Sequence, residues 1–92
     1  MKVDIFYHAQ IRLAAGGASG LVDVAPGTTV TALLRAQAER HGEAFRKIVL
    51  DDAGRVRPGI IVLVNDRPKA DSSDPVLTEG DRVALFSPVA GG

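Results

Sequence analysis

The sequence contains no cysteine, and its charges cancel. The lack of cysteine among 92 residues excludes disulfides, thiolate metal ligands and thiol nucleophiles. Eleven acidic and eleven basic residues give zero formal net charge, which argues against nucleic acid as a partner because phosphate binding needs a basic surplus. No apolar run approaches the roughly 20 residues of a membrane span, and Asp4 stands where the apolar part of a secretion signal would begin. We therefore expect a cytoplasmic protein that does not enter a membrane.

Aromatic side chains are also scarce. There are only three phenylalanines and one tyrosine, and tryptophan is absent, so valine, isoleucine, leucine and alanine must form most of the core. A chain of this length buries only about 60–65% of its unfolded surface. We expect one domain over residues 1–86, without room for a deep catalytic cavity, followed by a flexible tail over residues 87–92.

Hydrophobic periodicity predicts two strands and a helix in the first half. Alternation predicts a strand over residues 2–9, a glycine-rich hairpin loop over 14–20 and a second strand over 21–24. Thr28 or Thr29 can cap a helix over 29–41. Its buried face has helical spacing and comprises Val30, Leu33, Leu34, Gln37, Ala38 and His41. Gly42 is placed to end this helix in the left-handed backbone conformation.

The second half predicts three more strands. The aliphatic run over residues 60–64 is the best strand, residues 67–70 suit a brief edge strand, and 82–86 form the last one. Phe45 and Ile48 anchor a helical turn or irregular chain. This order predicts an α+β fold of the ubiquitin-like β-grasp type, with four to five strands in a mixed sheet and one main helix on one face. A ferredoxin-like fold would need a second long amphipathic helix, which residues 65–80 cannot supply.

No catalytic or metal-binding pattern is present. His8 and His41 lie on different predicted elements, without the partners that a general base or metal ligand needs. The Asp51-Asp52 pair lacks the alternating oxygen ligands of a calcium loop. We therefore expect a protein that is not an enzyme and that binds neither metal nor cofactor itself.

The C-terminal tail carries the strongest functional pattern. After Phe86 it contains only small or rigid residues and ends in Gly91-Gly92. Two glycines expose a terminal carboxylate without any Cβ, so the narrow channel of another protein can grip the backbone. Pro88 stiffens the base of an arm that reaches roughly 20 Å. The alternative is a frayed terminus that ends in glycine by chance.

Several motifs together resemble the MoaD/ThiS sulfur-carrier family over the whole chain. They are Ala9-Gln10-Ile11-Arg12, Pro26-Gly27-Thr28-Thr29-Val30, Val64-Asn65, Leu77-Thr78-Glu79-Gly80-Asp81-Arg82-Val83 and Phe86-Ser87-Pro88-Val89-Ala90-Gly91-Gly92. The resemblance implies that a ubiquitin-activating-like adenylyltransferase uses ATP to adenylate the Gly92 carboxylate. A sulfur donor then forms a thiocarboxylate, which a sulfur-accepting biosynthetic enzyme consumes. The resemblance does not decide whether the sulfur goes to the molybdopterin, cysteine or thiamine pathway or to a related sulfur metabolite.

Strand alternation also predicts a partner-binding face. If Val62 and Val64 face the helix, Phe6, Leu63 and Phe86 point out of the free sheet face. We expect this apolar group to bind partners together with the tail residues Pro88, Val89 and Ala90. A register shift of one residue would exchange the two faces.

Two functional classes remain open after these arguments. One is a sulfur carrier, and the other is a ubiquitin-like modifier joined to lysines through Gly92, since both begin with the same adenylation. An interaction domain with an inert tail is a third, weaker reading.

Overall fold

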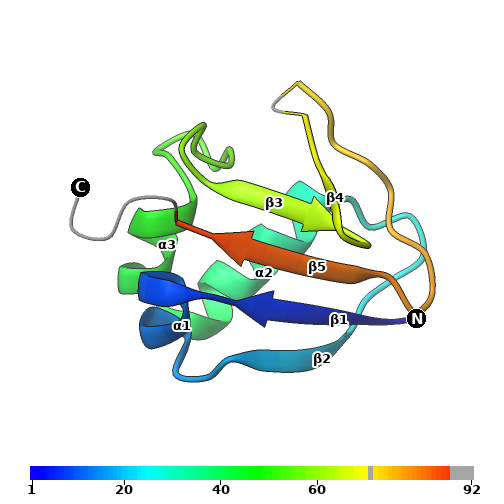
Figure 1. The fold of residues 1–92 in the computed structure, drawn as a ribbon, viewed down its shortest axis with the longest axis horizontal. Helices are drawn as coiled ribbons and strands as arrows, with labels where there is room; N and C mark the ends of the chain where they lie inside the picture. Colours follow the sequence, from blue (N-terminus) through cyan, green and yellow to red (C-terminus); the bar gives the residue numbers. More distant parts are fainter. Residues whose placement is uncertain (71, 88–92) are drawn as a thin grey trace.

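A five-stranded mixed sheet carries three helices in the computed structural model, which describes residues 1–70 and 72–87 (Figure 1). In chain order, the elements are β1 (Lys2–Tyr7), α1 (Ala9–Ala15), β2 (Ser19–Asp23), α2 (Val30–His41), α3 (Glu43–Val49), β3 (Ile61–Val64), β4 (Arg67–Pro68) and β5 (Arg82–Phe86). The sheet order is β2-β1-β5-β3-β4. The central pair β1 and β5 is parallel and the other pairs are antiparallel. The predicted α+β β-grasp arrangement is confirmed.

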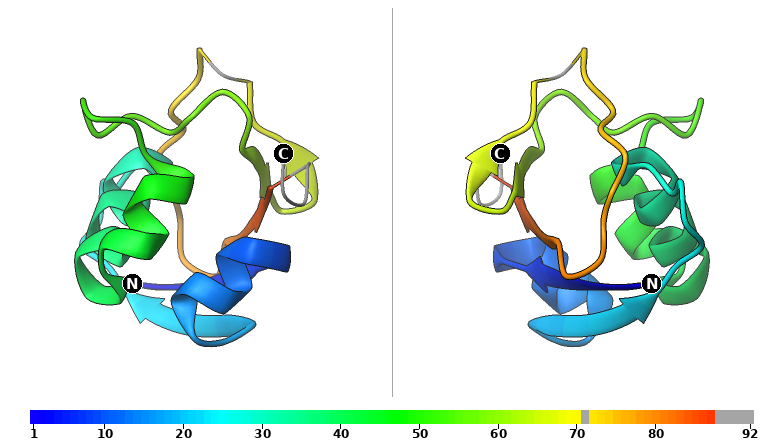
Figure 2. Two further views of the ribbon diagram at one scale, coloured as in Figure 1. Left: turned by 90° about the vertical axis from the view of Figure 1, so that its left-hand side faces the viewer. Right: turned by 90° about the vertical axis from the view of Figure 1, so that its right-hand side faces the viewer.

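Helix α2 covers the inner face of the sheet, with α3 beside it on the same side (Figure 2). The Thr29 side chain caps α2 by accepting a hydrogen bond from the Ala32 N–H at 3.2 Å. Val30, Leu33 and Leu34 are completely buried on the side of α2 that faces the sheet. From the sheet, the residues that are completely buried are Val3, Ile5, Val83 and Leu85. Alternation therefore assigned the inner face of β1 and β5 correctly.

The prediction of a flexible hairpin loop after the first strand was partly wrong. The segment Ala9–Ala15 forms the short helix α1, and Gly16 ends it in the left-handed conformation. Ile11 is buried, and Ala14 and Ala15 are partly buried against the core. These three residues have the i, i+3, i+4 spacing of a helix face, but the helix is only seven residues long and runs into the glycines that suggested a loop. The strands that it joins, β1 and β2, pair antiparallel as predicted.

α2 is the longest helix, as predicted, but the sequence left the segment that follows it open between a helical turn and irregular chain. The segment around Phe45 and Ile48 is a regular helix, with Phe45 and Val49 buried. Gly42 separates it from α2 at φ 98° and ψ −173°. This conformation has the positive φ that favours glycine but is not the left-handed stop that the sequence predicted. The chain therefore turns at Gly42 and starts a second helix at once.

The last strands are close to their predicted bounds. Strand β4 is only two residues long, lies at the sheet edge and holds Pro68, as expected. Asn65 and Asp66 connect β3 to β4 with φ values of 51° and 70°. Two consecutive positive φ angles are typical of the tight hairpin turn that follows the twist of the strands. This turn places Asp66 beside the outer face of the sheet.

Candidate functional site: the outer face of the sheet

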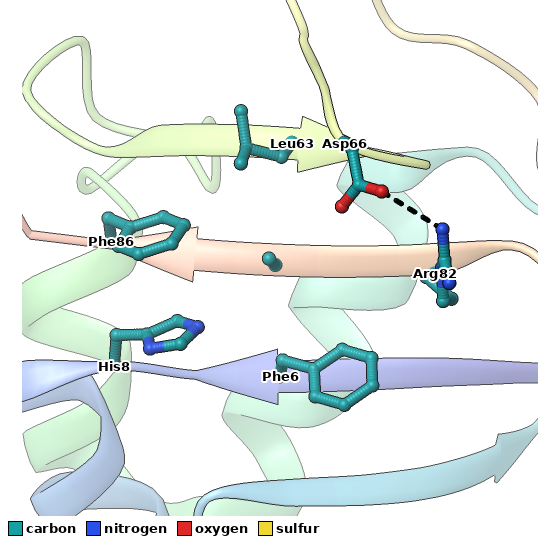
Figure 3. A pocket seen from close by; sticks show the side chains of 7 residues that line it. Phe6, His8, Leu63, Asp66, Arg82 and Phe86 are labelled. Carbon is teal, nitrogen blue, oxygen red and sulfur yellow. Dashed lines mark hydrogen bonds and ion pairs between the residues drawn. The ribbon is translucent and has the colours of Figure 1, made fainter.

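The three apolar residues predicted to face outward do lie together. Phe6 on β1, Leu63 on β3 and Phe86 on β5 line one open groove on the outer face of the sheet (Figure 3). We call this the outer groove. Its volume is about 270 Å³, and it is completed by His8, Asp66, Arg82 and Ala84. The predicted orientation of the three side chains is thereby confirmed.

The outer groove owes its shape to a small residue in the central strand. Ala84 of β5 pairs with Phe6 of β1 on one side and with Leu63 of β3 on the other. Cross-strand partners on one face stand about 5 Å apart, so the methyl group of Ala84 forms the floor between two larger side chains. A larger residue at this position would fill the groove.

An aromatic stack closes the end of the groove where β5 ends. The imidazole of His8 lies parallel to the Phe86 ring, with a centroid distance of 4.1 Å and an interplanar angle of 3°. The His8 N–H also donates to the Leu85 carbonyl at 3.2 Å, which continues the parallel pairing past the end of β1. The sequence predicted no catalytic or metal-binding partner for His8 and did not reveal this contact with Phe86. The pairing of β1 with β5 creates it, and no local pattern reports that pairing.

Charged residues form the opposite end of the groove. Arg82 donates to the Asp66 carboxylate at 3.0 Å (Figure 3). Both side chains are mostly exposed, so this ion pair contributes little stability. The adjacent Asn65 side chain donates to Asp81 at 2.9 Å and accepts from the Arg82 N–H at 2.9 Å. These bonds fix the β3–β4 turn against the start of β5, and they hold Asp66 at the groove.

The predicted tail residues lie outside the described part of the chain. β5 ends at Phe86, and Ser87 is the last described residue before Pro88, Val89, Ala90, Gly91 and Gly92. The outer groove therefore lies where the domain ends, because Phe86 lines the groove and is the last residue before the tail. The roles predicted for the tail stay predictions.

The inner face of the sheet holds a polar cluster at the C-terminal end of α2. Gln37 is buried and donates to the Tyr7 hydroxyl at 2.8 Å, and the same hydroxyl lies 3.3 Å from Nε2 of His41. Burial raises the pKa of Tyr7, although the bond from Gln37 and the charge of Arg40 act in the opposite direction. Burial also lowers the pKa of His41, with a further contribution from Arg40. Tyr7 thus stays a neutral phenol and His41 tends to stay neutral.

The described residues offer binding surfaces and little chemistry. Within residues 1–70 and 72–87, no three acidic, histidine or cysteine side chains gather as a metal site would require. No helix in those segments is both long and apolar enough to cross a membrane. The outer groove joins apolar and aromatic groups to one exposed ion pair, a combination suited to protein recognition.

Comparison with known proteins assigns the chain to a group of small ubiquitin-like proteins. The ThiS family model matches residues 5–92. Small archaeal modifier protein 3 of Haloferax volcanii is 36% identical over 95 residues, and the match covers both chains completely. The crystal structure of SAMP1 from the same organism is 32% identical with a TM-score of 0.85, again over both complete chains. A putative molybdopterin converting factor subunit 1 from Pyrococcus furiosus is 28% identical with a TM-score of 0.74, and the match covers 97% of this chain and 99% of that chain.

Proposed function

The chain belongs to the ThiS family, and from this membership we propose that it carries sulfur as a thiocarboxylate on Gly92. One observation carries the proposal: the family match extends from the first strand through the final Gly91-Gly92. The structure supports it because β5 lies at the centre of the sheet and ends at Phe86, only a few residues before Gly91-Gly92 in the sequence. A central strand gives a carried group a rigid base.

The proposed chemistry takes place in partner proteins. An adenylyltransferase binds ATP, and the Gly92 carboxylate attacks its α-phosphate, so pyrophosphate leaves and an acyl-adenylate forms. A sulfur donor at the oxidation level of sulfide then attacks the carbonyl carbon and displaces AMP. The thiocarboxylate finally transfers its sulfide-level sulfur to the substrate of a biosynthetic enzyme, and water supplies the oxygen that restores the carboxylate. This chain supplies the reacting carboxylate and the surface that positions it, and we propose no catalytic role for its side chains.

We propose that the outer groove is the surface that the adenylyltransferase recognises. Phe6 and Phe86 are half-buried and offer aromatic anchors on either side of the Ala84 floor. Aromatic residues in pockets dominate the binding energy of many protein interfaces. A partner seated on Phe86 would also meet the chain where the tail begins, which fixes the direction in which Gly92 enters its channel.

Protein modification is the second candidate function. It is favoured by the names of the relatives, since the Haloferax volcanii protein at 36% identity is described as a modifier. In that case a lysine amine attacks the activated carbonyl of Gly92 and forms an isopeptide bond. The two functions differ only in the nucleophile that follows adenylation.

Deletion of Gly92 tests the step that both functions share. We expect the shortened chain to lose ATP–pyrophosphate exchange with the adenylyltransferase of its own organism, because the carboxylate moves back by about 3.5 Å, beyond the near-attack range. Gly91→Val should be nearly as harmful, since a branched side chain would obstruct a channel built around glycine. Ala70→Ser, an exposed substitution far along the sequence from the tail, is the control and should exchange normally. Equal exchange by the deletion and the control would refute both functions.

Intact mass of the protein purified from its own cells separates the two functions. Replacement of one oxygen by sulfur identifies the carrier, and conjugates of higher mass that retain the Gly92 carbonyl on a lysine identify the modifier. Conjugates without any thiocarboxylate, under conditions that preserve thiocarboxylates, would overturn the carrier proposal.

A further inference from the structure

A second binding surface lies at the other edge of the sheet, along β2. This strand has β1 on one side only. Tyr7 N–H donates to the Ala18 carbonyl and Val24 N–H to the Met1 carbonyl, both at 2.8 Å. The direction of backbone hydrogen bonding alternates from one residue to the next along an antiparallel strand. The backbone N–H and C=O groups of Gly20, and of every second residue from it, therefore point toward β1. The backbone N–H and C=O groups that point away from the sheet belong to Ser19, Leu21 and Asp23.

A hollow lies beneath this edge, between β2 and α2. Its volume is about 160 Å³, and its lining includes the glycines of the α1–β2 connection and the polar end of α2. Gly20 is on the inner side of β2, and a Cβ added to it would meet no atom within 4 Å. The missing side chain therefore leaves room beside the edge for a side chain from another molecule. The polar part of the lining comes from Tyr7, Ser19, Gln37, Arg40 and His41.

The charge of this hollow is positive. Arg40 is exposed, and it forms no ion pair with any residue in the described segments. None of the residues that line the hollow is acidic. Asp23 at the end of β2 is already paired with the Met1 amino group at 3.2 Å and with Lys2 at 3.5 Å. An occupant of the hollow would find one unneutralised guanidinium and no opposing carboxylate.

The opposite side of the β2 edge carries one exposed apolar side chain. Leu21 lies opposite Asp4, points to the outer face and is 61% exposed. Residues of an added strand alternate between the two faces. A strand that fits this edge therefore places acidic side chains beside Arg40 and apolar side chains beside Leu21.

We propose that the β2 edge and the hollow beneath it form a docking site for an extended acidic peptide of a partner protein, which joins the sheet as a sixth strand. Main-chain hydrogen bonds to Ser19, Leu21 and Asp23 provide the affinity, and alternation of acidic and apolar residues provides the specificity. This site is separate from the outer groove and does not involve the tail. It thus permits a second partner to bind while Gly92 is engaged.

A second copy of the chain fits the edge less well. Antiparallel pairing of β2 with β2 would bring Gly20 and Val22 of the second copy to the inner side, where no carboxylate would meet Arg40. Charge complementarity therefore favours an acidic peptide over a dimer.

The test uses a short synthetic peptide, acetylated and amidated, that alternates valine with aspartate. Titration of the complete isotopically labelled protein, followed by NMR, should give saturable shifts and slower amide exchange at Ser19, Leu21 and Asp23. A peptide with lysine in place of aspartate is the matched control and should bind at least tenfold more weakly. Arg40→Gln should weaken binding of the aspartate peptide by about five- to tenfold.

Methylation of the peptide backbone tests strand pairing without any change to the protein. N-methyl groups on the alternate amides that face β2 should abolish binding, whereas N-methyl groups on the other amides should leave it. Leu21→Pro in the protein should also abolish binding of the unmethylated peptide, because it removes an N–H that points away from β1.

Three results would overturn the proposal. They are equal binding of the aspartate and lysine peptides, peptide-induced shifts at Phe6 and Leu63 in place of the β2 edge, and concentration-dependent protection of the β2 amides without peptide. The last result would identify a second copy as the occupant. Because no adenylyltransferase is present in the assay, its outcome is independent of the sulfur-carrier proposal.

Discussion

The two faces of the sheet are built from the same strands but do different work. On β1, Ile5 is completely buried under α2, while its neighbour Phe6 is half-buried and lines the outer groove. On β5, Leu85 and Phe86 repeat this relation. Each step along a strand turns the side chain to the opposite face. Stability and recognition are therefore separated residue by residue, and a substitution on one face should leave the property of the other largely unchanged.

The largest expected effect is the loss of stability from a substitution on the inner face. Ile5→Ala should reduce the free energy of unfolding by about 2–5 kcal/mol, because it leaves a cavity in the core. Phe6→Ala removes more atoms but should cost less than about 1 kcal/mol, since the site opens to solvent. Urea unfolding of both variants measures the difference. Similar losses for the two would mean that Phe6 belongs to the core and that the two faces are not separate.

The reverse experiment is a substitution on the outer face, which should affect partner binding and leave stability largely unchanged. Phe86→Asp should weaken binding of the adenylyltransferase by about 2 kcal/mol or more, roughly 30-fold, because it replaces an aromatic anchor by a charge. Calorimetric titration gives the affinity, and a melting curve of the same variant controls for folding. Ile61→Thr, beside Phe86 on the same face but outside the groove, is the matched control and should bind normally. Unchanged affinity of Phe86→Asp would remove the outer groove from the proposed mechanism.

A smaller effect is expected from filling the groove. Ala84→Leu should fill the space between Phe6 and Leu63. It should weaken binding of the adenylyltransferase by about tenfold, or 1.4 kcal/mol. The free energy of unfolding should change by less than about 1 kcal/mol, because Ala84 faces outward. Ala84→Ser keeps the floor low and serves as the control. Equal affinity of the leucine and serine variants would show that the hollow shape of the groove is not used.

The smallest expected effect concerns pH and the inner face. Burial lowers the pKa of His41 in the folded protein below its ordinary value of 6.5. The unfolded chain therefore takes up a proton more readily, so this contribution to stability is complete above pH 6.5 and declines as the pH falls toward the lowered value. His41→Gln should flatten this part of the stability profile. Urea unfolding between pH 5 and 8 is the measurement, and parallel profiles for wild type and variant would contradict the prediction.

Local patterns in the sequence were enough for much of the fold and part of the site. The helical spacing from Val30 to His41, the Thr29 cap and the alternation in β1, β3 and β5 are properties of short segments, and the structure confirms them. Phe6, Leu63 and Phe86 were placed on one face by the same alternation. The helix α1 was missed because its apolar face, made by Ile11, Ala14 and Ala15, is short and runs directly into Gly16 and Gly17, which suggested a loop.

What the sequence determined by itself was the face on which each side chain of a strand lies, because this depends only on alternation along the backbone. What tertiary structure decided was which strands are neighbours. The parallel pairing of β1 with β5 sets the His8 ring on Phe86 and lays Ala84 between Phe6 and Leu63. It also leaves β2 at the edge, with its outward backbone groups beside Arg40. Strand order follows from packing between segments far apart in the chain, and no local period in the sequence encodes that packing.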